Sequence, residues 1–199
     1  MLYYIHDPMC SWCWGFAPVL DKLMDQLPEH TEMTRLVGGL APDSDVPMPE
    51  ETREHVQRQW RRIEETIPGR KFNFDFWTQC QPRRSTYPAC RAVIAAREQG
   101  QEYDVLMTKA IQRAYYEQAR NPSDTETLVD LAREIGLDAG VFAIALTSPA
   151  VDEQFDREIG QSRALGARGF PSLVLVDGDI SRLIQIDYLD SAPMLAAVY

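Results

Sequence analysis

The sequence predicts an α/β fold in which a compact βαβ–ββα unit is interrupted by a long helical segment. The first observation is an apolar run at residues 2–5 that leads directly into apolar residues at helical spacing. The second is the return of strand-like runs after Gly169, separated by an Asp-Gly turn. Between them, residues 41–168 carry mostly helical signals. We therefore expect the first half of the α/β unit at 1–40, a helical insertion between its second and third strands at 41–168, and its second half at 169–199.

The first segment has the pattern of strand, helix and strand. Residues 2–5 form the expected first strand, and residues 32–37 form the second, which ends at Gly38-Gly39. The helix between them is indicated by apolar residues three and four positions apart, namely Phe16, Val19, Leu20, Leu23, Met24 and Leu27. Residues 41–50 are rich in Pro and Asp, which predicts a loop at the start of the insertion.

The insertion contains a series of helices with recognisable ends. We expect helices at about 51–67, 88–99 and 103–114. Ser123 and Glu126 resemble a capping box ahead of a further helix that Gly136 closes. A short helix at about 138–146 follows, and Ser148-Pro149 begins another.

The third segment has the pattern of a hairpin followed by a helix. Residues 172–176 form a predicted strand, Asp177-Gly178 the turn, and residues 180–188 the partner strand. Residues 190–199 form a short closing helix.

Charge and composition narrow the functional classes. The chain has 20 basic and 30 acidic residues, a formal net charge of −10, which argues against sequence-independent binding to nucleic acid or anionic membranes. No stretch approaches the roughly 18 apolar residues of a membrane span. The N-terminus shows neither a basic leader nor a long apolar region, so we expect a cytoplasmic protein. Its four cysteines are too few for a disulfide scaffold.

The most informative motif is Cys10-Ser11-Trp12-Cys13, which stands where the first strand passes into the first helix. Unpaired backbone N–H groups and the helix dipole at such a position favour a thiolate. Two intervening residues let the second thiol reach the first. The pattern therefore predicts a dithiol redox site in which Cys10 attacks a substrate disulfide and Cys13 resolves the mixed disulfide.

Three segments carry a resemblance to a known family. They are the run from Asp7 to Phe16, the run from Pro82 to Ala92, and Gly169-Phe170-Pro171-Ser172 ahead of the last hairpin. Together with the helical insertion, they resemble the DsbA-like branch of the thioredoxin-fold proteins, and most of all the cytoplasmic FrnE-like dithiol–disulfide oxidoreductases and isomerases. The resemblance implies a thioredoxin fold and a protein dithiol–disulfide oxidoreductase or isomerase.

The resemblance also implies a substrate platform. Pro171 is expected to be the cis-proline beside the catalytic cysteines, and the backbone of Phe170 to pair with an extended substrate. Ser11 and Trp12 complete the expected substrate-binding residues: Ser11 can offer a hydroxyl or N–H to the sulfur, and Trp12 an apolar surface.

The chemistry of the motif sets further expectations. The Ser11-Trp12 dipeptide brings no positive charge to the thiolate, so we expect a less oxidising couple than that of DsbA, acting as a reductase or isomerase. We expect no cofactor besides the dithiol and no metal, with protein or small-molecule thiols and disulfides as partners and glutathione as a candidate redox partner.

The two other cysteines leave alternatives open. Cys80 and Cys90 could form a second redox pair, or could be a loop cysteine and a buried helix cysteine, the interpretation we favour. With Cys10, Cys13 or His6 they could supply a zinc site, although their spacing is not that of a zinc knuckle.

Several neighbours of the motif also admit two interpretations. Asp7 and His6 could tune Cys10 or shuttle a proton, or could cap a turn and end a strand. We expect Trp14 and Phe16 in the core and Trp12 as the most exposed of the three aromatic residues. Two sets of arginines are either ligand-binding or solvated: we expect Arg83 and Arg84 to form a solvated edge more readily than an anion site, and the helix face with Arg53, Arg58, Arg61 and Arg62 to be solvated.

Two other functions compete with the dithiol enzyme. One is a glutathione-dependent isomerase or transferase, resembling the chromene-carboxylate isomerases and kappa-class transferases, in which a dithiol is not required. The other is a non-enzymatic adaptor that docks a client for a protease. Retention of both Cys10 and Cys13 speaks against the first, and the second predicts function without Cys10.

Overall fold

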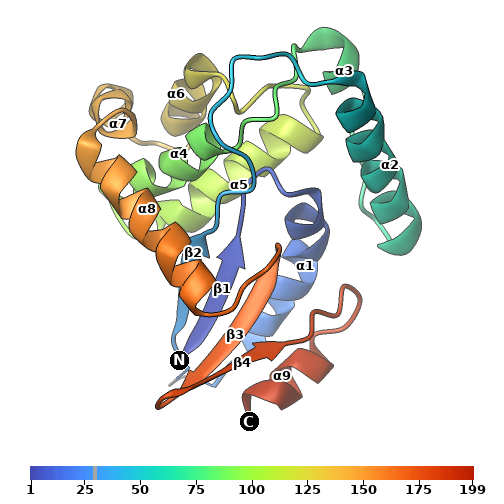
Figure 1. The fold of residues 1–199 in the computed structure, drawn as a ribbon, viewed down its shortest axis with the longest axis vertical. Helices are drawn as coiled ribbons and strands as arrows, with labels where there is room; N and C mark the ends of the chain where they lie inside the picture. The colour runs from blue at the N-terminus through green and yellow to red at the C-terminus, as the bar shows by residue number, and fades with distance from the viewer. Residues whose placement is uncertain (29–30) are drawn as a thin grey trace.

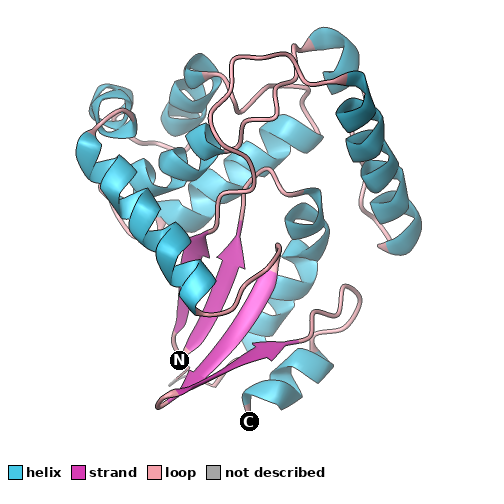
Figure 2. Cartoon of the chain, in the orientation of Figure 1, coloured by secondary structure: helices cyan, strands magenta, loops and turns pink. Residues whose placement is uncertain are grey.

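The computed structural model describes residues 1–28 and 31–199, which form a four-stranded sheet surrounded by helices (Figures 1 and 2). The strands are β1 (Leu2–His6), β2 (Met33–Val37), β3 (Ser172–Asp177) and β4 (Ile180–Ile184). The helices are α1 (Ser11–Gln26), α2 (Glu50–Thr66), α3 (Phe76–Gln79), α4 (Tyr87–Arg97), α5 (Tyr103–Tyr116), α6 (Thr125–Glu134), α7 (Ala139–Leu146), α8 (Pro149–Ala164) and α9 (Ala192–Val198).

The sheet has the order β2-β1-β3-β4, which is the arrangement that a βαβ–ββα unit generates. β1 pairs in parallel with β2, and β3 is antiparallel to both β1 and β4. The thioredoxin-type fold expected from the sequence, with a helical insertion between the second and third strands, is confirmed.

The alternation of side chains along the strands divides the apolar core between the two faces of the sheet. Leu2 and Tyr4 of β1 pack with α1 and α9. Ile5 faces the other way and packs near the chain that follows α8. In Figure 1, α8 crosses one face of the sheet, while α1 and α9 lie on the other.

The helices of the insertion gather beyond the C-terminal ends of β1 and β2, next to the start of α1 (Figure 1). Their largest buried side chain is Trp60 of α2, which stacks on Phe72 at 4.9 Å between ring centroids and contacts Trp77 and Tyr116. The same core includes Met9 and buried apolar side chains of α4, α5, α6, α7 and α8. The insertion is therefore packed against the CxxC segment, and α2 packs against the rest of the insertion through buried aromatic residues.

Helix ends follow several of the local signals. Asp138 and Ser148 are the N-caps of α7 and α8, and their side chains accept hydrogen bonds from backbone N–H groups of the first turn. Gly136, with a φ of 90°, follows α6 in the left-handed conformation that glycine tolerates.

Three predictions about local structure are wrong. The capping box does not form, because Asp124 is the N-cap of α6 and the Ser123 hydroxyl donates instead to Ser85 O at 2.6 Å. The partner strand ends at Ile184 rather than residue 188. Continuing the register would place the next residue opposite Ser172, the first residue of β3, and the one after it opposite Pro171, which has no N–H to donate.

The third difference is at the hairpin turn, which is one residue later than predicted. Asp177 still pairs with Ile180, so Gly178 and Asp179 form the turn. The short helix α3 was not predicted, and the remaining elements differ mainly at their ends. Among the described helices, none combines the length and apolar character needed to cross a lipid bilayer.

Candidate active site

Cys10 and Cys13 lie at the beginning of α1, directly beyond the C-terminal end of β1. Cys10 is the N-cap residue with extended backbone angles, and its N–H donates to Asp7 O at 3.0 Å. Its side chain is nearly buried, with 6% exposure, while Cys13 is completely buried. Both thiols are free. The helix start thus presents one thiol at the surface edge and holds the other beneath it.

The segment before β3 brings a second element to Cys10. The Phe170–Pro171 peptide bond is cis, and the Cys10 thiol donates to Phe170 O at 3.4 Å. The ring of Phe170 covers Gly38 so closely that a Cβ there would lie 2.0 Å from Phe170 Cε1. The sequence-predicted residues Cys10, Phe170 and Pro171 are therefore side by side, and Gly38 leaves the space that Phe170 fills.

Helix α2 holds the dipeptide between the cysteines. Trp60 Nε1 donates to Ser11 Oγ at 3.0 Å, and Trp12 Nε1 donates to Gln59 Oε1 at 3.2 Å. The Trp12 ring also makes an edge contact with Tyr188, at 4.9 Å between centroids. These contacts, from residues far along the chain, fix the orientation of both intervening side chains.

The three aromatic residues in the first turns of α1 differ in burial as expected. Trp14 and Phe16 are buried, and Trp12 is only partly buried at the edge of the core. A cleft of about 200 Å³ lies beside Cys10. Its lining includes Ser11, Trp12 and Phe170, residues of α2, and Arg83, Arg84 and Thr86. A substrate that enters it meets Cys10 before Cys13.

Burial decides the protonation of the inner thiol. It raises the pKa of the Cys13 thiol well above its ordinary value, and the neighbouring Cys10 acts in the same direction. Cys13 is consequently held as a neutral thiol in the reduced protein, and must lose its proton before it can act as a nucleophile.

Asp7 is a buried carboxylate that ties three segments together behind the motif. Its Oδ1 accepts the Met9 N–H at 2.8 Å, and its Oδ2 accepts the Leu40 N–H at 2.7 Å. Oδ2 also accepts from the Thr86 hydroxyl at 2.6 Å and the Cys90 thiol at 3.4 Å. Burial raises the pKa of Asp7, against these hydrogen bonds, which lower it. This arrangement matches the turn-capping interpretation of Asp7 and extends it to two distant segments.

His6 is a core residue at the end of β1. Its ring stacks on Tyr4 at 4.9 Å, and neither ring nitrogen has a hydrogen-bond partner among the described residues. Burial, together with Arg35 and Arg97, lowers the pKa of His6 well below its ordinary value. The side chain is therefore a neutral ring inside the protein, as the strand-end interpretation expects.

Cys80 and Cys90 have separate surroundings. The Cys80 thiol donates to Ala119 O at 3.0 Å, whereas Cys90 is fully buried beside Asp7. Burial raises the pKa of both thiols, strongly so for Cys90. Within residues 1–28 and 31–199, no group of three or more His, Cys, Asp or Glu side chains is arranged to hold a metal ion.

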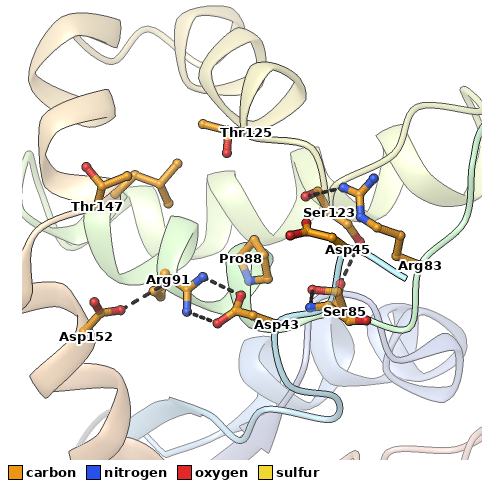
Figure 3. A pocket seen from close by; sticks show the side chains of 12 residues that line it. Asp43, Asp45, Arg83, Ser85, Pro88, Arg91, Ser123, Thr125, Thr147 and Asp152 are labelled. Atoms are coloured by element: carbon orange, nitrogen blue, oxygen red, sulfur yellow. Dashed lines mark hydrogen bonds and ion pairs between the residues drawn. The ribbon is translucent and has the colours of Figure 1, made fainter. Parts of the chain in front are cut away.

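A polar cavity of about 600 Å³ lies next to the cleft, and Arg83 lines both (Figure 3). Arg83 donates to Ser123 O at 2.8 Å and pairs with Asp124. Arg91, on the far side of the cavity, pairs with Asp43 in a bidentate contact (Figure 3). Both arginines of this cavity are therefore paired within the protein, whereas Asp45 has no ion pair among the described residues.

The arginines of α2 follow the expectation of a solvated face in part. Arg58 is well exposed and, among the described residues, pairs only with Glu54, while Arg53 donates to Trp77 O at 3.1 Å. The guanidinium groups of Arg61 and Arg62 lie over the rings of Phe74 and Trp12.

Sequence reasoning missed several residues of the site. Gln59, Trp60, Tyr115 and Tyr188 all contact or line it, but they come from segments read only as helix or strand. The polar α2 carries one Trp among charged residues, and this was the available signal that α2 has a packed side.

Comparison with known families gives a match over nearly the whole chain. The model of the family described as DSBA-like thioredoxin domain matches residues 4–196.

Solved structures of proteins described as disulfide isomerases and reductases also match nearly the whole chain. A crystal structure from Nitrosomonas europaea, provisionally described as a protein disulfide isomerase, is 28% identical, with a TM-score of 0.83 over 99% of this chain and 94% of that chain. The cytosolic disulfide reductase DsbM from Pseudomonas aeruginosa is 25% identical, with a TM-score of 0.75 over 99% of this chain and 92% of that chain. A second structure of DsbM, with GSH, matches with a TM-score of 0.72.

Among curated proteins, the ClpXP adapter protein SpxH of Halalkalibacterium halodurans is 24% identical over 183 residues. The match covers 90% of this chain but only 59% of that relative's length.

Proposed function

Because the chain belongs to the DSBA-like thioredoxin domain family, we propose that it is a thiol–disulfide oxidoreductase that acts through Cys10 and Cys13. One observation carries the proposal: the thiol at the start of α1 lies 3.4 Å from Phe170 O, next to the cis bond that precedes Pro171. Cys10 and Phe170 both line the cleft, so one substrate can reach the thiol and the segment before Pro171 together.

The reaction proceeds in two exchanges. The Cys10 thiolate attacks one sulfur of the substrate disulfide, that bond breaks, and the first thiolate leaves. The Cys13 thiol then loses its proton and attacks Cys10 in the mixed disulfide, which releases the second substrate thiol and leaves a Cys10–Cys13 disulfide. The protein is oxidised by two electrons, and the substrate is reduced to two thiols.

We assign the substrate platform to Phe170 and Pro171, with Trp12 and Ser11 on the side of α2. The dipeptide between the cysteines carries no cation, which supports a reductase or isomerase rather than a strong oxidant. Similarity to the cytosolic reductase DsbM supports action in the cytoplasm, and the DsbM structure with GSH supports glutathione as redox partner. The closer likeness to FrnE-like proteins stays a prediction.

A trapping experiment tests this function. Reduced Cys13→Ser protein, mixed with a disulfide-bonded peptide, should accumulate a mixed disulfide at Cys10 that mass spectrometry detects. Cys10→Ser should form none. Cys80→Ser is the matched control, because that thiol bonds to Ala119 O rather than lining the cleft, and it should exchange like the wild type. Absence of a mixed disulfide in Cys13→Ser would contradict the proposal.

The reduction potential of the Cys10–Cys13 pair then shows whether the protein reduces or oxidises its substrates. Equilibration in glutathione buffers, followed by Trp fluorescence, should give a value nearer the roughly −270 mV of thioredoxin than the roughly −120 mV of DsbA. A value near that of DsbA would exclude the reductase.

A second candidate function is that of an adaptor, which similarity to SpxH supports. An adaptor would deliver a client to a protease without using its thiols. Client degradation that survives Cys10→Ser, in a protein without exchange activity, would favour this alternative.

A further inference from the structure

We propose that the cleft beside Cys10 selects small disulfides that carry a carboxylate, and that Arg84 provides the cation that recognises this group. The inference rests on the proposed disulfide exchange at Cys10 and adds the charge and size of the substrate to it. Its evidence lies in the charged and polar residues that line the cleft.

The lining of the cleft has a charge opposite to that of the protein. The chain carries 30 acidic and 20 basic residues, yet among the described residues no Asp or Glu lines this cleft. His55, Arg83 and Arg84 do line it. A concave, partly apolar site whose charged residues are both arginines attracts anions locally, even on an acidic protein.

The two neighbouring arginines differ in whether their guanidinium groups are already paired within the protein. Arg83 is held by Ser123 O and by its ion pair with Asp124, on the side of the neighbouring cavity (Figure 3). Arg84 is exposed, and within the described part of the chain it has neither a hydrogen-bond partner nor an ion pair. Its guanidinium therefore keeps its planar pair of donors for a ligand, the geometry that binds a carboxylate through two hydrogen bonds.

Tyr115 supplies a second donor at the cleft. The residue is 4% exposed and lines the cleft, and among the described residues its hydroxyl makes no hydrogen bond, yet the oxygen is not one of the fully buried unpartnered polar atoms. The hydroxyl therefore keeps an open side at the cleft, where it can donate to a ligand. Burial raises the pKa of Tyr115 and Arg84 opposes this, which places the guanidinium near the phenol. A carboxylate could accept from both groups at once.

The size of the cleft limits what enters. Its volume is about 200 Å³, below the range of roughly 300–1,000 Å³ that is typical of sites enclosing a drug-sized ligand. It accommodates one half of a small disulfide, with the sulfur at Cys10 and the carboxylate toward Arg84. The substrate class is therefore a low-molecular-weight disulfide with an acidic group, rather than an uncharged one.

A pair of chromogenic disulfides tests the inference. The first is 5,5′-dithiobis(2-nitrobenzoate), which carries two carboxylates, and the second is its uncharged bis-amide. Each molecule reacts with the reduced Cys10–Cys13 dithiol to give two aromatic thiols and the protein disulfide, so no other reductant is needed. Absorbance of the released thiol gives a second-order rate constant for each probe.

We expect Arg84→Gln to lower the ratio of the dicarboxylate rate to the bis-amide rate by about ten-fold, the size expected for one charge-assisted contact at a partly exposed site. Arg58→Gln is the matched control. It removes the same charge from a well-exposed side chain that does not line the cleft, and it should leave the ratio within about two-fold of wild type. Equal urea midpoints would show that both variants fold.

Each outcome bears on a different claim. A selective loss in Arg84→Gln supports the inference. Equal slowing of both probes, no effect, or the same change in ratio in Arg58→Gln would overturn it while leaving disulfide exchange intact. Absence of thiol release from either probe in the wild-type protein would overturn the proposed function, and this inference with it. Strong discrimination for an acidic disulfide peptide but not for the dicarboxylate probe would overturn the assignment to small disulfides.

Discussion

The stability of an Asp7→Asn variant relative to the wild type should increase as the pH rises. Asp7 is completely buried, and burial raises its pKa from the ordinary 3.8 despite four hydrogen bonds to the carboxylate. The folded protein therefore binds the Asp7 proton more tightly than the unfolded chain does. A neutral amide of the same shape removes that linkage.

The magnitude follows from the direction of the pKa shift. Below pH 3.8 the carboxyl is protonated in both states. The Asn amide has one acceptor oxygen, so either the Met9 or the Leu40 N–H loses its acceptor, and we expect Asp7→Asn to be about 2 kcal/mol less stable than the wild type there. As the pH rises from 3.8 through the folded-state pKa, the wild type loses about 1.4 kcal/mol of unfolding free energy for each unit by which folding raises the pKa. Above the folded-state pKa the difference is constant.

The assay is urea unfolding of the reduced proteins between pH 4 and 8, with the difference between variant and wild type as the measured quantity. Asp7→Ala is the contrasting variant. It leaves the buried Met9 and Leu40 N–H groups without an acceptor, and we expect it to cost about 4 kcal/mol, or about 2 kcal/mol for each N–H. A relative stability of Asp7→Asn that falls as the pH rises would refute the reasoning, because it would mean that the hydrogen bonds outweigh burial.

Three further outcomes follow from the same contacts. Gly38→Ala should displace Phe170, whose Cε1 would lie 2.0 Å from the new Cβ, and cost about 1–3 kcal/mol in urea unfolding together with slower exchange at the site; an unchanged midpoint and rate would contradict the packing argument. Glu158→Ala should cost about 3–5 kcal/mol by the same method, because the Val37 N–H and a paired arginine lose their buried acceptor; a loss below about 1 kcal/mol would show that water replaces it. Iodoacetamide at pH 8 should leave Cys90 unmodified in the native protein and label it in urea, as read by mass spectrometry, since burial raises the pKa of its thiol; labelling at the same rate in both states would exclude its burial.

The sequence alone determined the elements whose signals are local. The apolar run before Cys10 and the helical spacing after it specify a strand and a helix, because both patterns arise from neighbours within a few residues. The caps at Asp138 and Ser148 and the stop at Gly136 are local in the same way. The capping box at Ser123 failed because a contact with Ser85, 38 residues away, took its hydroxyl.

Only the tertiary structure decided which distant residues complete the site. Cys10 meets Phe170 across 160 residues, and Asp7 meets Thr86 across 79. Arg83 and Arg84 are adjacent and chemically identical in the sequence, and both line the cleft, yet only Arg83 is paired with other described residues of the protein. Such differences depend on how the insertion packs against the sheet, and packing is a property of the whole chain rather than of any short segment.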